Sequence, residues 1–145
     1  AVYQIARDFG TNDKPAHIFA GARTANRLYF IEDCKDIAQV TTATDDGSCG
    51  FQGRVTDALA DYLAELSPEA LNKLWFYNCG PAPMIHAAEK VQRDFGAEQQ
   101  IFSAIDYTTK CGVGICGACA SPDGRRICID GPFINREPDL LPGLG

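Results

Sequence analysis

The sequence predicts an α/β protein in which a parallel sheet covered by helices is followed by a small cysteine-rich module. Short apolar strands alternate with amphipathic helices through residue 104, as is typical of a doubly wound, Rossmann-like sheet. Beyond residue 104 the chain is rich in Gly and Cys and has almost no apolar periodicity. We therefore expect a sheet domain over residues 1–104 and a separate module with its tail over 105–145.

The first elements alternate helix and strand. Apolar side chains at helical spacing predict a helix over residues 1–10, and a polar turn follows at 12–15. The apolar run 16–21 predicts a strand buried on both faces, residues 24–38 a helix, and the β-branched run 40–44 a second strand. The side chains expected on the apolar helix faces are Val2, Ile5, Ala6, Phe9, Leu28, Ile31 and Ile37.

The same alternation continues to residue 105. In order, the sequence predicts a turn-rich loop at 45–53, a helix at 55–66, a strand at 73–79, a sharp turn at 80–83, a helix at 84–95 and a strand at 100–105. The apolar stripes of these two helices are Val55, Leu59, Tyr62, Leu63 and Leu66, and Met84, Ile85, Ala88, Val91 and Phe95. Trp75, Phe76 and Tyr77 are expected in the core, His17 is expected to be a satisfied core histidine, and His86 to face solvent.

The chain opens on a helix, with no strand or Gly-rich turn before it. In a doubly wound sheet the first strand lies at the centre, and the loop after it holds the pyrophosphate of a dinucleotide. We therefore expect that this strand and its phosphate loop are missing, and that the chain is a fragment of a longer protein.

Composition narrows the classes of partner. The net charge is −6 and no run of Lys or Arg occurs, which argues against nucleic acid or an anionic membrane as partner. No apolar run approaches the roughly 18 residues of a membrane span, and the N-terminus lacks the order of a signal peptide. We expect a cytoplasmic protein.

Seven cysteines occur in 145 residues, and four of them lie close together in the sequence as Cys111-x4-Cys116-x2-Cys119-x8-Cys128. The first three match the plant-type pattern for a [2Fe–2S] cluster, with a fourth cysteine downstream. The intervening glycines allow left-handed backbone and a close approach of N–H groups to the sulfurs. Structural zinc is the rival, but zinc sites usually pair their ligands in two short knuckles. Of the other cysteines, we expect Cys34 to be buried and Cys49 to have no functional role.

Three loops follow predicted strands at the edge where α/β sheets bind ligands. They are Gly21-Ala22-Arg23, Asp45-Asp46-Gly47-Ser48, and Cys79-Gly80-Pro81-Ala82-Pro83-Met84. Arg23 could face a phosphate, and a carboxylate of Asp45 or Asp46 could bind ribose hydroxyls and repel a 2′-phosphate. That chemistry favours NADH over NADPH, whereas the alternative is three ordinary capped turns.

These loops and the cysteine pattern, which ends in Cys128-Ile129-Asp130-Gly131-Pro132-Phe133, resemble the electron-transfer subunit of dihydroorotate dehydrogenase B, within the ferredoxin–NADP reductase superfamily. The resemblance covers nearly the whole chain. It implies an oxidoreductase of pyrimidine biosynthesis that relays electrons between NAD(H), FAD and a flavin-containing catalytic subunit through a [2Fe–2S] cluster. It also implies that Cys79 and Gly80 lie near the nicotinamide and flavin, and that Arg23 and the 45–48 loop face the adenosine.

The chain departs from this family in lacking the N-terminal FAD-binding barrel, so we expect FAD binding to need the missing domain. Two other functions stay open. One is an electron-transfer subunit of a hydrogenase or a ferredoxin–NADP oxidoreductase, and the other is a zinc-stabilised nucleotide-binding module without redox activity. The sequence leaves both homo-oligomers and hetero-oligomers open.

Overall fold

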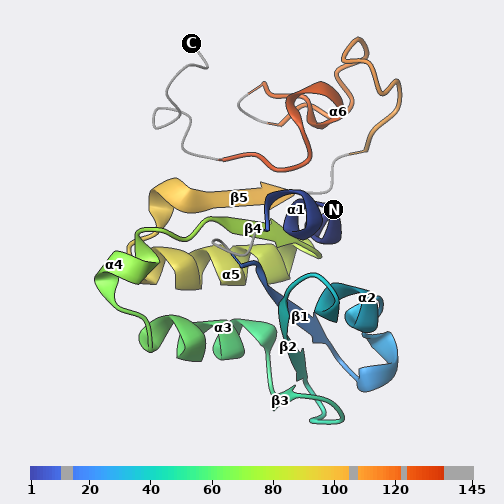
Figure 1. The fold of residues 1–145 in the computed structure, drawn as a ribbon. Helices are drawn as coiled ribbons and strands as arrows, with labels where there is room; N and C mark the ends of the chain where they lie inside the picture. Colours follow the sequence, from blue (N-terminus) through green and yellow to red (C-terminus); the bar gives the residue numbers. More distant parts are fainter. Residues whose placement is uncertain (11–14, 105–107, 122–123, 136–145) are drawn as a thin grey trace. The chain divides into compact units, whose positions relative to one another are not determined.

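The computed structural model describes residues 1–10, 15–104, 108–121 and 124–135, and the chain divides into two compact units, 1–66 and 67–145 (Figure 1). The predicted turn at 12–15 falls largely outside the described residues, as does nearly all of the tail after residue 135. The boundary between the two compact units, at residues 66 and 67, lies inside the predicted 1–104 domain. The predicted boundary at residue 104 between the nucleotide-binding domain and the cysteine-rich module stays a prediction.

The first unit is a three-stranded parallel sheet in the order β1-β2-β3. Its elements are α1 (Val2–Phe9), β1 (His17–Ala22), the 3-10 turn η1 (Ala25–Arg27), α2 (Ile31–Lys35), β2 (Gln39–Thr44), β3 (Phe51–Gln52) and α3 (Val55–Ala64). Ile18 of β1 packs with Ala6 of α1 and Cys34 of α2, whereas the rings of His17 and Phe19 contact Tyr62 of α3. Because side chains alternate along a strand, helices cover both faces of β1, as the sequence predicts.

The predicted helix over 24–38 is wrong in its middle. The chain forms η1, passes through an extended Leu28, and adopts a left-handed conformation at Phe30 (φ 59°) before α2 begins. The break lies at Leu28 and Phe30, whereas the start of η1 is held by a distant residue, because the free N–H of Ala25 donates to Ser48 Oγ (2.7 Å). Cys34 is buried, as predicted.

The second unit contains a parallel pair, β4 (Phe76–Cys79) and β5 (Ile101–Ala104), in the register Phe76↔Ile101. Its other elements are α4 (Pro68–Leu71), α5 (Ala82–Asp94), η2 (Glu98–Gln100) and α6 (Ile127–Asp130). The helix α5 packs on β4 and β5. A polar network joins them, because Asn78 and Gln92 exchange amide hydrogen bonds (2.8 and 2.9 Å) and Asn78 also donates to Ser103 Oγ (3.3 Å).

Several predicted core positions are wrong. Trp75 is 59% exposed because β4 begins only at Phe76, and Phe9 is exposed at the end of α1. On α5 the fully buried side chains are Ile85, Glu89 and Gln92, so the buried face is more polar than the predicted apolar stripe.

The two histidines differ in their surroundings. His17 Nε2 contacts Thr41 Oγ1 (2.8 Å), but its Nδ1 is buried and has no hydrogen-bond partner among the described residues, so the expectation of a satisfied histidine is wrong for that atom. His86 is exposed, as predicted, with Nδ1 3.6 Å from a carboxylate oxygen of Glu89.

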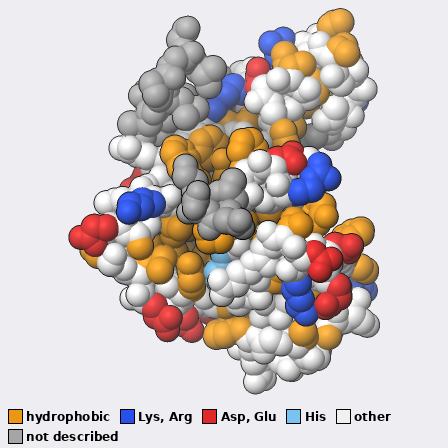
Figure 2. All heavy atoms as spheres, viewed as in Figure 1, with side chains coloured by type: hydrophobic (Ala, Val, Ile, Leu, Met, Phe, Trp, Pro, Cys, Tyr) orange, Lys and Arg blue, Asp and Glu red, His pale blue; other side chains and the backbone are white. Residues whose placement is uncertain are grey.

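The surface agrees with an acidic chain. On the face shown in Figure 2, Lys and Arg side chains are scattered among acidic ones and do not gather into a basic patch. Within the described ranges, no helix is both long and apolar enough to cross a bilayer.

Candidate functional site

The four predicted cluster ligands are free thiols that lie as two neighbouring pairs. Cys111 neighbours Cys116, whose thiol contributes to the lowered pKa of Cys111, and Cys128 neighbours Cys119, whose side chain raises the pKa of Cys128. Cys111 also lies close enough to Cys128 for the two charges to interact. Cys111 and Cys116 are exposed, Cys128 is half-buried and Cys119 is buried.

Backbone N–H groups surround the Cys111 sulfur. It accepts hydrogen bonds from the N–H groups of Cys116, Val113 and Ile115, and these bonds, with the Cys116 thiol, lower the pKa of Cys111 to about 6. Hydrogen bonds to the charged form of a thiol favour thiolate, which is the form that ligates metal. The Cys128 pKa is raised, chiefly by the neighbouring Cys119 side chain and by burial, against the opposing hydrogen bond from the Gly114 N–H.

Glycines give this loop its shape. Gly112, Gly114 and Gly117 all have φ between 71° and 76°, in the left-handed region that side chains disfavour. Gly114 is also crowded, because a Cβ there would lie 2.6 Å from Ile129 Cδ1. Its carbonyl oxygen accepts a hydrogen bond from Arg126 Nη1 (2.8 Å), which fixes the loop to the chain before α6.

Short antiparallel pairing brings the fourth cysteine next to the third. Ala120 pairs with Arg126 in an antiparallel bridge, and Ser121 N–H donates to the Arg125 carbonyl (2.8 Å). The Ile127 N–H then donates to the carbonyl of Cys119 (3.2 Å), so that Cys128 on α6 lies beside Cys119. This pairing places the third and fourth predicted ligands side by side although eight residues separate them in the sequence.

The donor set fits a [2Fe–2S] cluster. Each iron of such a cluster takes two protein sulfurs in addition to the bridging sulfides, and the thiols lie as two pairs. In the part of the chain that the structure describes, no three His, Cys, Asp or Glu side chains gather around one point as a single ion would need.

Two of the three predicted nucleotide loops lie together in the first unit. They follow β1 and β2, which run in parallel with Gly21 opposite Ala43, and Asp45 and Asp46 donate their N–H groups to the carbonyls of Ala22 and Arg23 (3.2 Å each). Gly21 is needed because a Cβ would lie 2.6 Å from Val55 Cβ at the start of α3.

Ser48 stabilises this pair of loops. Its Oγ donates to Asp46 Oδ1 (2.6 Å), and its N–H donates to the same oxygen (3.0 Å), with Gly47 between them in a left-handed conformation. The Ser48 hydroxyl is the main cause of the lowered pKa of Asp46. One carboxylate oxygen of Asp46 is thus engaged in the turn, a role that the sequence analysis did not anticipate.

The third loop begins in the second unit, at the end of β4. Cys79 is exposed, and Gly80 (φ 154°) leaves space for the Met84 side chain, since a Cβ on Gly80 would lie 2.2 Å from Met84 Cε. Pro81 precedes the first turn of α5 and accepts the Met84 N–H (2.9 Å). The exposed thiol therefore stands beside a helix N-terminus.

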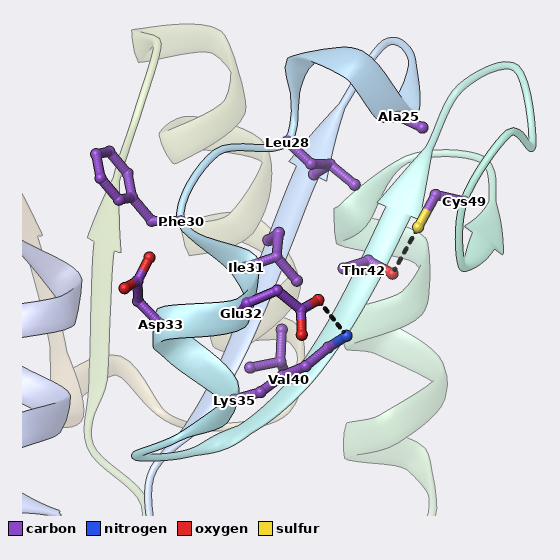
Figure 3. A pocket seen from close by; sticks show the side chains of 10 residues that line it. All are labelled: Ala25, Leu28, Phe30, Ile31, Glu32, Asp33, Lys35, Val40, Thr42 and Cys49. Atoms are coloured by element: carbon purple, nitrogen blue, oxygen red, sulfur yellow. Dashed lines mark hydrogen bonds and ion pairs between the residues drawn. The ribbon is translucent and has the colours of Figure 1, made fainter.

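A pocket of about 450 Å³ lies on the α2 side of β2 (Figure 3). Its lining is Ala25, Leu28, Phe30, Ile31, Glu32, Asp33, Lys35, Val40, Thr42 and Cys49. Lys35 Nζ contacts Glu32 Oε1 (2.7 Å), and Cys49 Sγ lies 3.6 Å from Thr42 Oγ1. The pocket borders the 3-10 turn held by Ser48, but none of the predicted nucleotide-binding residues lines it.

Two family models match different parts of the chain. Residues 2–90 match the oxidoreductase NAD-binding domain family, and residues 108–138 match the iron–sulfur cluster binding domain of dihydroorotate dehydrogenase B. The second match contains all four paired cysteines.

Curated relatives and one solved structure are similar over most of the chain. A probable dihydroorotate dehydrogenase B electron transfer subunit of Methanocella arvoryzae is 32% identical over 97% of this chain and 51% of its own length. Its counterpart in Pyrococcus abyssi is 35% identical over 94% of this chain and 49% of its own length. A chain in a structure of the NADH-dependent reduced ferredoxin–NADP oxidoreductase has a TM-score of 0.70 and 28% identity, over 92% of this chain and 47% of that one. The chain thus spans about half the length of these relatives.

Proposed function

Because the chain belongs to the dihydroorotate dehydrogenase B electron-transfer subunit family, with an oxidoreductase NAD-binding domain, we propose that it relays electrons between NAD(H), FAD and a partner oxidoreductase. The paired thiols of Cys111 with Cys116 and of Cys119 with Cys128 carry this proposal, because they form the donor set of a [2Fe–2S] cluster. When bound, such a cluster takes up and gives up single electrons.

The residues of the cluster loop would tune this centre. The N–H groups of Val113, Ile115 and Cys116 already point at the Cys111 sulfur, where they stabilise negative charge. Hydrogen bonds to cluster sulfurs favour the reduced, more negative state and so raise the reduction potential. Residues 105–145 would hold the cluster, and residues 1–104 would hold the dinucleotide.

The nucleotide residues would bind different parts of NAD(H). Support for an adenosine site comes from the tied loops that carry Gly21, Ala22 and Arg23 and the Asp45–Ser48 turn, with exposed Arg23 available to a phosphate and Asp45 to ribose hydroxyls. An acidic residue there disfavours a 2′-phosphate, so we expect NADH to be preferred.

The other end of the dinucleotide would lie at the third loop. Cys79, Gly80, Pro81 and Met84 would face the nicotinamide and the flavin, supported by their place at the carboxyl end of β4 and at the start of α5. FAD itself would be held mainly by the portion of the relatives that this chain does not span.

The partner would contact the cluster loop. Val113 and Ile115 are 62% and 85% exposed beside the exposed Cys111 and Cys116, and an exposed apolar tip is typical of a surface that contacts another protein. The names of the relatives, which denote an electron transfer subunit of dihydroorotate dehydrogenase B, support a catalytic subunit of that enzyme as this partner, and we expect that subunit to contain a flavin. All seven cysteines are free, which suits the reducing cytoplasm.

Chemical analysis of the anaerobically purified chain tests the cluster. We expect iron and acid-labile sulfide in equal amounts and a visible spectrum that bleaches with dithionite. Cys116→Ser should lose both, whereas Cys49→Ser, outside the two pairs, should keep both. Stoichiometric zinc in a colourless protein would refute the proposal.

The ferredoxin–NADP oxidoreductase neighbour makes a second partner class worth testing. Capture of the cluster-loaded chain with a dihydroorotate dehydrogenase catalytic subunit supports the first partner. Capture with a ferredoxin-linked or hydrogenase subunit supports the second. NADH titration with and without the N-terminal half of a relative tests whether that half is needed for tight binding, and equal affinity would refute that need.

A further inference from the structure

After the cluster loop the chain returns to the sheet of the second unit. Ser103 of β5 and Ile134 exchange backbone hydrogen bonds, each 3.1 Å, as an isolated antiparallel bridge. Asn135 Nδ2 donates to the Gln99 carbonyl (3.0 Å), and the Asn135 side chain is buried. In Figure 1 the red segment after α6 runs alongside β5.

Phe133 contacts the sheet by its ring. It meets Tyr77 edge to face, with centroids 5.5 Å apart and planes at 87°, and Tyr77 in turn stacks on Phe102 at 5.4 Å. Tyr77 and Phe102 are register partners on β4 and β5. Because Tyr77 precedes Cys79 by two residues on one strand, both side chains lie on the same face of the sheet.

The strands under this contact are held from the opposite face. The Asn78–Gln92 amide pair joins β4 to α5, and Asn78 also donates to Ser103, the residue that pairs with Ile134. The segment 133–135 therefore attaches to a part of the sheet that is itself fixed.

We propose that Phe133 is a positioning residue that holds the cluster-binding segment at a fixed place on the β4–β5 sheet. Five peptide steps join it to Cys128, and each spans at most about 3.6 Å, so a fixed Phe133 limits how far the ligands can move. The ring takes no part in binding iron. It sets the separation between the Cys79 end of β4 and the four cysteines, on which the rate of electron passage depends. This inference rests on the proposed function.

Paramagnetic broadening in the cluster-loaded full chain tests the position of the cluster directly. A reduced cluster broadens nearby amide NMR signals, so the wild type should show a defined broadening pattern along β4 and β5, including Tyr77 and Ser103. In Phe133→Ala this pattern should be lost or averaged, while iron content and the electron paramagnetic resonance spectrum stay unchanged. Phe133→Tyr should restore the pattern, and Tyr29→Ala, which removes an exposed aromatic ring outside this ring cluster, should leave it intact.

A second measurement does not need the cluster. In the metal-free chain, Phe133→Ala should speed hydrogen exchange of the paired Ser103 and Ile134 amides. Unchanged broadening in Phe133→Ala would overturn this inference alone, as would a loss of iron in that variant, which would make the ring part of the cluster site. A wild-type chain that binds no iron would overturn the proposed function, and this inference with it.

Discussion

Replacing Gly114 with alanine, compared with the same change at Gly112, separates the free-energy cost of a left-handed backbone from the cost of a side-chain clash. A left-handed residue other than glycine costs about 1–2 kcal/mol, and this applies equally at Gly112 and Gly114, whose φ values are 72° and 76°. Only at Gly114 does the new Cβ meet a side chain, 2.6 Å from Ile129 Cδ1, whereas nothing lies within 4 Å at Gly112. Moving Ile129 off its rotamer costs about 0.5–1.5 kcal/mol more.

The predicted cost is therefore about 1–2 kcal/mol for Gly112→Ala and about 1.5–3.5 kcal/mol for Gly114→Ala. The difference corresponds to about a two- to tenfold lower apparent stability of the loaded loop. Iron release to a chelator, followed by absorbance in both variants, measures it. Ile129 is 48% exposed, so Ile129→Ala should cost little by itself and should bring Gly114→Ala back to the level of Gly112→Ala. Equal iron release from the two single variants, or no rescue in the double variant, would refute this reasoning.

Three further predictions concern stability. Burial lowers the pKa of His17 from 6.5, so the unfolded chain binds more protons at low pH and the free energy of unfolding should fall as the pH drops below about 6.5. When that free energy is measured by urea unfolding at several pH values, His17→Phe should lack this part of its pH dependence. Asn78→Leu leaves the buried Gln92 amide without its Asn78 partner and should lower the free energy of unfolding by about 1–3 kcal/mol. The double variant Asn78→Leu with Gln92→Leu should lose less than the sum of the two single variants, and additive losses in urea unfolding would contradict this. Gly50→Ala would place Cβ 2.2 Å from a carbonyl oxygen of β2, whereas Gly96 has open space around it at a similar positive φ, so Gly50→Ala should lower the melting temperature more than Gly96→Ala. Equal shifts of the melting temperature would show that the loop adapts.

Much of the fold could be read from the sequence, because hydrophobic periodicity is a local signal. The bounds of α1, β1, β2, α5 and β5 lie within two residues of the predicted ones. The failures occur where a distant contact overrides propensity. The Ser48 hydroxyl caps the short turn that begins at Ala25, and an amide pair makes the buried face of α5 polar. Neither contact leaves a trace in residue spacing.

The sequence by itself was enough to predict the chemistry of this protein. Cysteine spacing and glycine content are enough to predict the cluster and its four ligands, since the ligand types and the loop they need lie within 18 residues. Tertiary structure alone decided how the thiols pair, which amides surround Cys111, and where Phe133 and Asn135 attach to β5. Pairing and attachment depend on distances between residues far apart in the chain, and only packing fixes such distances.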